Sequence, residues 1–399
     1  MLMLNVEPIE QALAAAVGPR RIPGVVAAAV TRDGVIFEGA AGARSAASPE
    51  PMPVDAVFRI ASMTKTITAV AAMQLVEQGA LSLDRPAKEV LPALGEVSVL
   101  TGFDADGPIL RPPRTDITLR HLLTHTAGFA YETWNAKIAR YVREQGLPPM
   151  RSAKLRALAV PLASDPGERW EYGVNIEMVG RMIEAVSGSD LETHLQAHVL
   201  KPLGMPDTSY IARPAWEDRL AAVHARGADG TLEAIASPPV DEARREFFPG
   251  GGGLFSTAHD YLRLLRALLN GGELDGVRIL NAETVAMMGE NHMGALNVLP
   301  LPTEMPGLSN PVNLMPGITK KWGLSFLINS EAIPDGRAAG SLAWAGLMNT
   351  YFWLDPAIGV AGVFMTQILP FADRIVLDAF DAFERAVYEV VSTGKPKHA

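Results

Sequence analysis

The sequence predicts an α+β protein in which an antiparallel sheet flanked by helices is joined to a second, mostly helical lobe. Strand-like and helix-like segments occur at both ends of the chain, over residues 1–85 and 250–399. Residues 86–249 instead show helical segments separated by loops rich in proline and glycine. Because 399 residues exceed the usual size of one domain, we expect an α/β lobe built from both termini, a helical lobe at 86–249, and an active-site cleft between them.

The N-terminal segments are expected to form a helix followed by a hairpin. Apolar residues recur at helical spacing over residues 7–17. Apolar runs at 25–30 and 35–37 follow, and Asp33-Gly34 between them tolerates the positive φ angles of a tight turn. This pattern is typical of two antiparallel strands.

Residues 62–78 are predicted to form a buried helix, because apolar and small residues recur at i, i+3 and i+4, and Gly79 can end it in a left-handed conformation. A second helix should begin at Thr257, where Thr257–Asp260 resembles a capping box. Toward the C-terminus we expect a final amphipathic helix, preceded by extended segments at 322–328, 348–354 and 360–365.

Composition excludes several classes of function. The 35 basic and 44 acidic side chains give a net charge of −9 without a basic run, which argues against a nucleic-acid partner. Cysteine is absent, so disulfides, thiolate catalysis, zinc–thiolate sites and iron–sulfur clusters are excluded. No apolar stretch approaches the ~20 residues of a membrane span, and the N-terminal residues lack a secretory pattern, so we expect no membrane partner and a cytoplasmic location. The oligomeric state is not determined by the sequence.

Ser62 and Lys65 begin the predicted buried helix. Positions i and i+3 share a helix face, so the hydroxyl and the amine can come within hydrogen-bond distance. A serine becomes a good nucleophile when an adjacent base takes its proton, and the amides at a helix N-terminus favour developing negative charge. A second Ser-x-x-Lys, Ser392–Lys395, lies in a polar tail and is not expected to function. No serine has the Gly-x-Ser-x-Gly context of an α/β-hydrolase.

Other candidate sites have weaker support. His121 and His125 stand at i and i+4, a spacing that can hold zinc, but a Glu between them and a third ligand are missing. We therefore expect no metal and no cofactor, with His125 holding loop structure near the cleft. Gly250–Gly253 lacks the Gly-Lys-Ser/Thr ending of a phosphate loop and is interpreted as a close-packed turn.

Several ordered landmarks together resemble the serine β-lactamase and penicillin-binding-protein superfamily, most closely the class C β-lactamase-like esterases of carboxylesterase family VIII. The landmarks lie in chain order at 58–65, 117–128, 166–172, 202–205, 251–257, 322–326 and 344–346. This resemblance implies a β-lactamase/transpeptidase-like fold and covers most of the chain.

The resemblance also implies roles for individual residues. Tyr172 matches the family's catalytic tyrosine, a general base or proton shuttle beside Lys65. Trp344-Ala345-Gly346 matches the position of Lys-Thr-Gly on the strand that lines the cleft. The amides of Ser62 and Leu347 would then form the oxyanion hole, and Gly346 would permit close approach of the acyl group.

Two departures from the family pattern bear on the substrate. Trp344 replaces a cation that would bind a carboxylate, and Val174 stands where lactamases have an asparagine. A site without these groups should favour neutral esters over charged lactams or D-alanyl peptides. Tyr131 and Trp134 are candidates to line an apolar acyl or alcohol pocket, or alternatively to pack within the helical lobe.

We therefore expect a serine carboxylesterase that acts on neutral esters with short acyl chains through a Ser62 acyl-enzyme. An acyltransferase of the same fold is the nearest alternative, and β-lactamase or DD-peptidase activity is another. A non-catalytic binding protein that keeps the fold would lack a reactive Ser62.

Overall fold

The computed structural model describes residues 4–237 and 240–393. Its main sheet has eight strands in the order β12-β13-β14-β15-β16-β1-β2-β3, and every neighbouring pair is antiparallel. The strands come from both ends of the chain: β1 (Gly24–Thr31), β2 (Val35–Ser45), β3 (Ser48–Pro51), β12 (Lys320–Trp322), β13 (Leu327–Asn329), β14 (Leu342–Gly346), β15 (Thr350–Asp355) and β16 (Val360–Met365). The predicted α+β class with an antiparallel sheet is confirmed.

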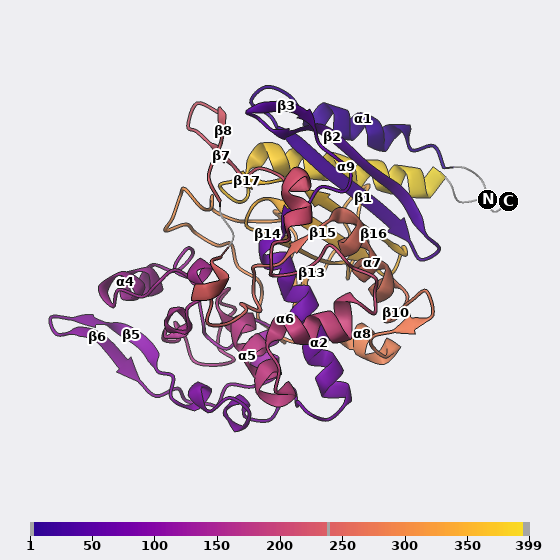
Figure 1. Ribbon diagram of the computed structural model, residues 1–399. Helices are drawn as coiled ribbons and strands as arrows, with labels where there is room; N and C mark the ends of the chain where they lie inside the picture. The colour runs from indigo at the N-terminus through magenta and orange to yellow at the C-terminus, as the bar shows by residue number, and fades with distance from the viewer. Residues whose placement is uncertain (1–3, 238–239, 394–399) are drawn as a thin grey trace.

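Helices cover both faces of this sheet. α1 (Glu7–Ala16) and α9 (Arg374–Thr393) lie side by side on one face, where Val25, Ala27 and Ala29 of β1 pack with them (Figure 1). Val26, Ala28 and Val30 point to the opposite face, toward α7 (Ala258–Leu269). Because successive side chains of a strand alternate between faces, a strand covered on both sides needs a continuous apolar run, as β1 has.

The helix α2 (Thr64–Glu77) lies in the interior between the sheet and the middle part of the chain (Figure 1). Residues 64–75 of this helix are all buried, which explains its content of small and apolar side chains. It packs against α5 (Asn175–Ser187) and α6 (Leu191–Leu195). The Ser62 end of α2 is thereby fixed between the sheet and the middle segment.

The middle segment, 86–249, contains more strand than we predicted. Alongside α3 (Leu119–Leu123), α4 (Ala136–Glu144), α5 and α6 it has one hairpin of β5 (Val99–Asp104) and β6 (Gly107–Arg111) and another of β7 (His224–Arg226) and β8 (Leu232–Ala234). β7 also pairs with β17 (Ile368–Leu369), which ties this segment to the C-terminal part. The two-lobe division at 86 and 249 stays a prediction. Short elements complete the described chain: β4 (Phe58–Arg59), β9 (Phe255–Ser256), β10 (Glu273–Leu274), β11 (Val277–Arg278) and α8 (Ala282–Met288).

Local expectations were met unevenly. Gly79 has a φ of +72° and follows α2, as predicted. The hairpin between β1 and β2 forms, but neither Asp33 nor Gly34 has a positive φ; the turn includes a 2.9 Å hydrogen bond from Thr31 N to Gly34 O. The single extended segment predicted at 322–328 is wrong: a turn from 323 to 326 separates β12 from β13.

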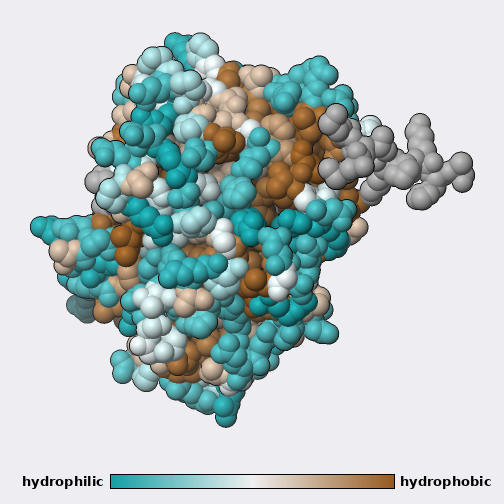
Figure 2. Space-filling view, turned by 45° about the vertical axis from the view of Figure 1, so that its right-hand side comes forward, coloured by the Kyte–Doolittle hydropathy of each residue, from teal (hydrophilic) through white to brown (hydrophobic). Residues whose placement is uncertain are grey.

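The surface view in Figure 2 is mainly hydrophilic, with hydrophobic residues gathered at its upper right and in smaller groups elsewhere. Within the described ranges, no helix combines the length and apolar character needed to cross a bilayer.

Candidate active site

Ser62 lies in a tight turn directly before α2. The turn spans Ala61–Met63, and the φ of Ala61 is +44°, a left-handed value that costs energy for a residue with a Cβ. The backbone of Ile60 is held by a 3.0 Å hydrogen bond from its N–H to the carbonyl of Leu254. Ser62 itself is half-buried. The strained turn therefore places the hydroxyl at the N-terminal end of α2 while leaving it partly accessible.

Lys65 carries the buried amine of the site, with 1% of its surface exposed. Its Nζ lies 3.1 Å from Ser62 Oγ, 3.2 Å from Tyr131 OH and 2.6 Å from Gly251 O. These three acceptors match the three protons of an ammonium, and a neutral amine could keep two of the contacts while accepting the proton of Ser62. The predicted approach of the serine hydroxyl to the lysine amine is present.

The glycine-rich turn at Gly250–Gly253 forms one wall of the lysine site. A Cβ on Gly250 would lie 2.4 Å from the carbonyl oxygen of Ile176, so α5 approaches this backbone closely. Thr68 Oγ1 donates to Gly250 O at 2.7 Å and fixes the turn against α2. The prediction of a close-packed turn is confirmed by these contacts, and its carbonyl at Gly251 is also a ligand of Lys65.

A tyrosine and a glutamate that we did not assign to the catalytic machinery extend this network. Tyr131 OH donates to Glu177 Oε1 at 2.6 Å. Burial and the carboxylate of Glu177 raise the pKa of Tyr131 well above its ordinary value, so the phenol keeps its proton. Glu177 is 1% exposed, and burial raises its pKa while Lys65 opposes this shift. The sequence offers one signal for Glu177, its place between the apolar residues Ile176 and Met178.

Tyr172 is buried beside the same lysine. Lys65 Nζ lies 4.8 Å from the centre of the Tyr172 ring, so the cation faces the ring rather than the hydroxyl. The hydroxyl accepts a 3.0 Å hydrogen bond from Trp344 Nε1, and Trp344 packs edge-on against Trp322 with ring centres 4.6 Å apart. Among the described residues the phenol donates no hydrogen bond, which leaves its proton available to a ligand.

His125 is fully buried against the rings of Tyr172 and Trp322. Its ring centre is 4.7 Å from that of Tyr172, and its Nδ1 lies 2.9 Å from Asn175 Nδ2. Burial and the charge of Lys65 lower its pKa well below the ordinary value, so the ring is neutral. The carbonyl of His125 accepts from Glu171 N at 2.8 Å, which connects the loop after α3 to the segment that carries Tyr172.

The end of β14 meets the Ser62 turn at Gly346. A Cβ there would lie 2.3 Å from the carbonyl oxygen of Ile60, two residues before Ser62, so only glycine permits this approach. Leu347 follows at the start of the turn to β15. The structure thus brings together the two chain segments whose amides we expect to form the oxyanion hole.

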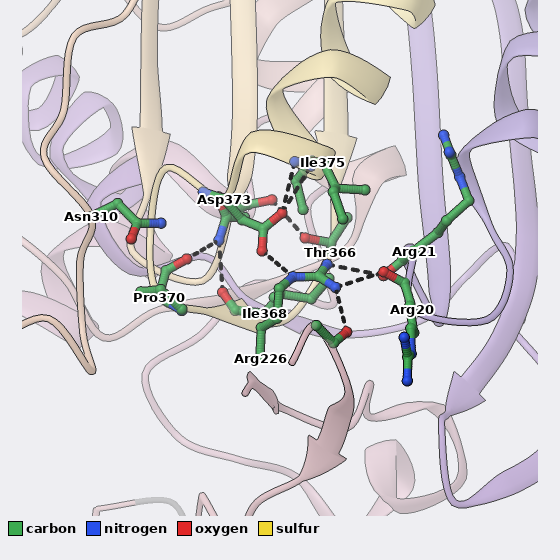
Figure 3. Close-up of polar contacts among 12 residues, drawn as sticks. Arg20, Arg21, Arg226, Asn310, Thr366, Ile368, Pro370, Asp373 and Ile375 are labelled. Carbon is green, nitrogen blue, oxygen red and sulfur yellow. Dashed lines mark hydrogen bonds and ion pairs between the residues drawn. The ribbon is translucent and has the colours of Figure 1, made fainter. Parts of the chain in front are cut away.

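Asn349 holds that turn with a φ of +59°. Its Nδ2 donates to the carbonyls of Ile368 and Pro370 at 2.8 and 2.9 Å, and its Oδ1 accepts from Asp373 N at 3.1 Å. Figure 3 shows Asp373 in turn receiving Arg226, whose guanidinium also reaches backbone carbonyls of the N-terminal segment. These hydrogen bonds hold the turn between β14 and β15, which contains Leu347.

Trp134, Val174 and Trp344, which we expect to affect substrate binding, lie in different surroundings. Trp134 is half-buried, its Nε1 donates to Ser309 Oγ at 3.0 Å, and its ring lies 5.3 Å from that of Tyr172. Val174 is buried at the start of α5. A small crevice of about 20 Å³ adjoins Trp344, and its other lining residues are mainly apolar: Trp170, Val298, Leu299, Leu301, Val312, Asn313, Leu314, Lys320 and Leu327.

Lys320 is the cation of this crevice. It donates to Asn313 Oδ1 and to the carbonyls of Met315 and Ile318, at 3.1 to 3.3 Å. All three ammonium protons are therefore used within the chain, and burial lowers its pKa. Lys320 therefore has no proton left to bind a substrate carboxylate, the role that we expect of the lysine whose position Trp344 occupies.

Other possible sites lie away from Ser62 and Lys65. A larger cavity, of about 540 Å³, is lined by residues around Arg181 and Arg245 and contains none of the predicted site residues. Both arginines are paired with carboxylates of the same cavity, Glu184 and Glu242. Within the described residues no group of three or more His, Asp or Glu could hold a metal ion. Of the second Ser-x-x-Lys, Lys395 lies outside the described residues.

The Beta-lactamase family model matches residues 9–386, and the chain belongs to this family. It is 32% identical over 402 residues to ML-236A carboxylate methylbutanoyltransferase mlcH of Penicillium citrinum, covering 97% of this chain and 95% of the relative. It is 30% identical to lovastatin esterase of Penicillium rubens, covering 96% and 98%. The unliganded structure of simvastatin synthase (LovD) from Aspergillus terreus superposes with a TM-score of 0.81 at 30% identity, covering 97% and 100%. The family predicted from the sequence landmarks is therefore confirmed, and its members named here catalyse acyl transfer or ester hydrolysis.

Proposed function

We propose that this protein is a serine carboxylesterase that cleaves neutral esters through an acyl-enzyme on Ser62. The observation that carries the proposal is the 3.1 Å contact between Ser62 Oγ and the buried Nζ of Lys65. An amine in this position can take the hydroxyl proton as the oxygen attacks the ester carbonyl. The esterase among the relatives supports the same chemistry.

The remaining steps are assigned to groups around that pair. The amides of Ser62 and Leu347 stabilise the oxyanion, and Tyr172 protonates the departing alcohol. Since the Tyr172 oxygen accepts from Trp344 Nε1, its own O–H can point toward the leaving group. Water then attacks the acyl-enzyme and gives one proton to the Tyr172 phenolate, while the Lys65 ammonium returns its proton to Ser62 Oγ as the acid leaves. No step needs a metal or a cofactor.

The substrate class follows from charge. A buried indole occupies the place of a carboxylate-binding cation, and Lys320 nearby is internally satisfied. We therefore propose neutral esters as substrates and a cytoplasmic location, and we expect a cephalosporin to be turned over less efficiently.

An acyltransferase is the second candidate, because the relative from Penicillium citrinum is named a methylbutanoyltransferase. In that case an alcohol, rather than water, would intercept the same acyl-enzyme. The chemistry at Ser62 would be unchanged, and only the acceptor would differ.

The test uses p-nitrophenyl esters of increasing acyl length with the wild type, Ser62→Ala and Ser392→Ala. Ser392 is a matched control because it belongs to the second Ser-x-x-Lys and is exposed. We expect Ser62→Ala to lose turnover and Ser392→Ala to keep it. Equal rates for Ser62→Ala and the wild type would overturn the proposal. Product analysis with an added primary alcohol distinguishes the two acceptors, since a transferase gives mainly the new ester and an esterase mainly the free acid.

A further inference from the structure

A continuous chain of hydrogen bonds leads from the nucleophile to a buried carboxylate. Lys65 Nζ contacts Ser62 Oγ and Tyr131 OH, and Tyr131 OH donates to Glu177 Oε1 over 2.6 Å. Because the O–H of Tyr131 donates a hydrogen bond to the carboxylate, its oxygen presents a lone pair to the lysine. The arrangement orients the three groups as cation, dipole and anion.

The surroundings of Glu177 indicate that this contact is its main polar support. Its Oε2 is buried without a hydrogen-bond partner among the described residues. A Cβ on Gly251 would lie 2.4 Å from both carboxylate oxygens, so the carboxylate packs directly on the backbone whose carbonyl accepts from Lys65. A carboxylate in such a place is stable as an anion only with a nearby positive charge.

The other titratable groups facing this site do not provide that charge. Tyr172, whose ring centre lies 5.4 Å from that of Tyr131 and 4.8 Å from Lys65 Nζ, carries no positive charge, and His125 is a neutral ring. Glu132 acts on both Tyr131 and Glu177 as a further negative charge. The cation that faces Glu177 is therefore Lys65.

We propose that Glu177 is the counter-charge of Lys65, acting through the hydroxyl of Tyr131, and that it stabilises the ammonium formed when Lys65 accepts the proton of Ser62. The inference rests on the proposed acyl-enzyme chemistry. In the proton transfer, the O–H bond of Ser62 breaks, an N–H bond of Lys65 forms, and the electron pair of the oxygen attacks the ester carbonyl. Glu177 touches neither substrate nor the reacting atoms, so it is a positioning residue, comparable to the carboxylate behind the histidine of a serine protease.

Removal of the negative charge has two measurable consequences. A lysine without its counter-charge is a weaker base, and a facing opposite charge changes basicity by about 1–3 units, so the rate at the high-pH plateau should fall by up to about 10³-fold. The same change makes the ammonium lose its proton more easily. The acid limb of the pH–rate profile should therefore move about 1–3 units toward lower pH. A purely structural defect would lower the rate without moving the limb.

The experiment measures the rate at which a fluorophosphonate labels Ser62 between pH 5 and 10, alongside ester hydrolysis. The variants are Glu177→Gln, Glu177→Asp, Tyr131→Phe and the double variant Glu177→Gln/Tyr131→Phe. Glu192→Gln is the matched control, because Glu192 is also buried but accepts from Ser209 Oγ and Tyr210 N.

We expect the limb to shift in Glu177→Gln, to shift in the same direction in Tyr131→Phe, and to shift no further in the double variant. Glu177→Asp, which keeps the charge, should restore the wild-type limb, and Glu192→Gln should not move it. Coincident limbs for Glu177→Gln and the wild type would overturn the inference. If Glu177→Gln does not fold, Glu177→Met, which fills a similar space without the charge, is measured by the same criterion. Labelling of Ser62 without ester turnover would contradict the proposed esterase function, and the labelling profiles would still decide the role of Glu177.

Discussion

Gly346→Ala should disrupt the oxyanion hole by forcing apart the two segments that form it. The added Cβ would lie 2.3 Å from the carbonyl oxygen of Ile60 and 2.3 Å from Thr350 Oγ1. Because ordinary contacts begin near 3.4 Å, the backbones must separate by about 1 Å, a displacement that can cost about 10²-fold in rate. Ile60 precedes Ser62 by two residues and Gly346 precedes Leu347, so the separation acts directly on the two proposed amide donors.

Loss of one oxyanion donor typically lowers kcat by about 10²–10³. We expect that loss for Gly346→Ala, together with a decrease of about 1–3 kcal/mol in the free energy of unfolding from overpacking. The assay is hydrolysis of a saturating p-nitrophenyl ester, at a temperature below the Tm of the variant. Gly34→Ala is the control, since a Cβ there meets nothing within 4 Å and its φ is not positive. A folded Gly346→Ala enzyme with a rate close to that of the wild type would refute the assignment of this region to the oxyanion hole.

Further predictions concern the phenol, the buried ion pairs and the substrate. Trp344→Phe removes the indole N–H that donates to the hydroxyl of Tyr172, and it should lower kcat/KM, measured by steady-state kinetics, by about 2- to 10-fold. An unchanged kcat/KM would mean that this hydrogen bond is unimportant. Arg337→Met leaves Glu384 buried without its partner and should lower the free energy of unfolding, measured by urea titration, by about 3–5 kcal/mol. The double variant Arg337→Met/Glu384→Leu should recover most of this loss. Equal stability of the single and double variants would contradict this prediction. The Arg111 guanidinium lowers the pKa of Asp165 to about 2, below the unfolded value, so this carboxylate stabilises the fold above about pH 4 and the contribution is lost as the pH falls toward 2. Asp165→Asn should therefore be less stable at pH 7 and show a shallower decline in Tm over that acid range, and parallel declines would argue against the assignment. A chromogenic cephalosporin should have a lower kcat/KM than p-nitrophenyl acetate, and the reverse order would favour β-lactamase activity.

The contact between Ser62 and Lys65 could be predicted because it is local. Residues three apart on a helix share a face whatever the rest of the fold does, and Ser62 and Lys65 meet as that rule requires. The glycine turn was also readable, because glycines in sequence indicate close backbone approach. The Ser62–Lys65 contact depends on neighbours in the chain, whereas the partners of the glycine turn, Ile176 and Thr68, are set by tertiary packing.

Tyr131 and Glu177 could not be assigned in the same way. Their hydrogen bond joins residues 46 positions apart, and neither lies in a short motif with a known mechanism. Tyr131 was expected to line a pocket or to pack, yet it donates to the carboxylate and contacts the lysine. A glutamate within the buried face of α5 is unusual, because an ionisable group there needs a partner. A glutamate among apolar residues could have identified Glu177 as a candidate site residue, but it could not have identified Tyr131 as its partner.

The hairpins of the middle segment were missed for a related reason. The strands β5 and β6 alternate only weakly between apolar and polar residues and are largely exposed or half-buried. Hydrophobic periodicity is the main sequence signal for strands, and it is weak where neither face is buried. The turn at 323–326 was missed because Ser325 adopts a φ of +76°, which favours glycine and which its residue type does not announce.

The central claim is a covalent acyl-enzyme on Ser62, and mass spectrometry of acid-quenched enzyme tests it most directly. The protein is mixed with excess p-nitrophenyl acetate, quenched within the first turnovers, digested and mapped. We expect an acetyl group, an increase of about 42 Da, on the peptide that carries Ser62 and its absence in Ser62→Ala, as a nucleophilic serine requires. An acetyl group on another residue of an enzyme that turns over the ester, with Ser62 unmodified, would contradict the account.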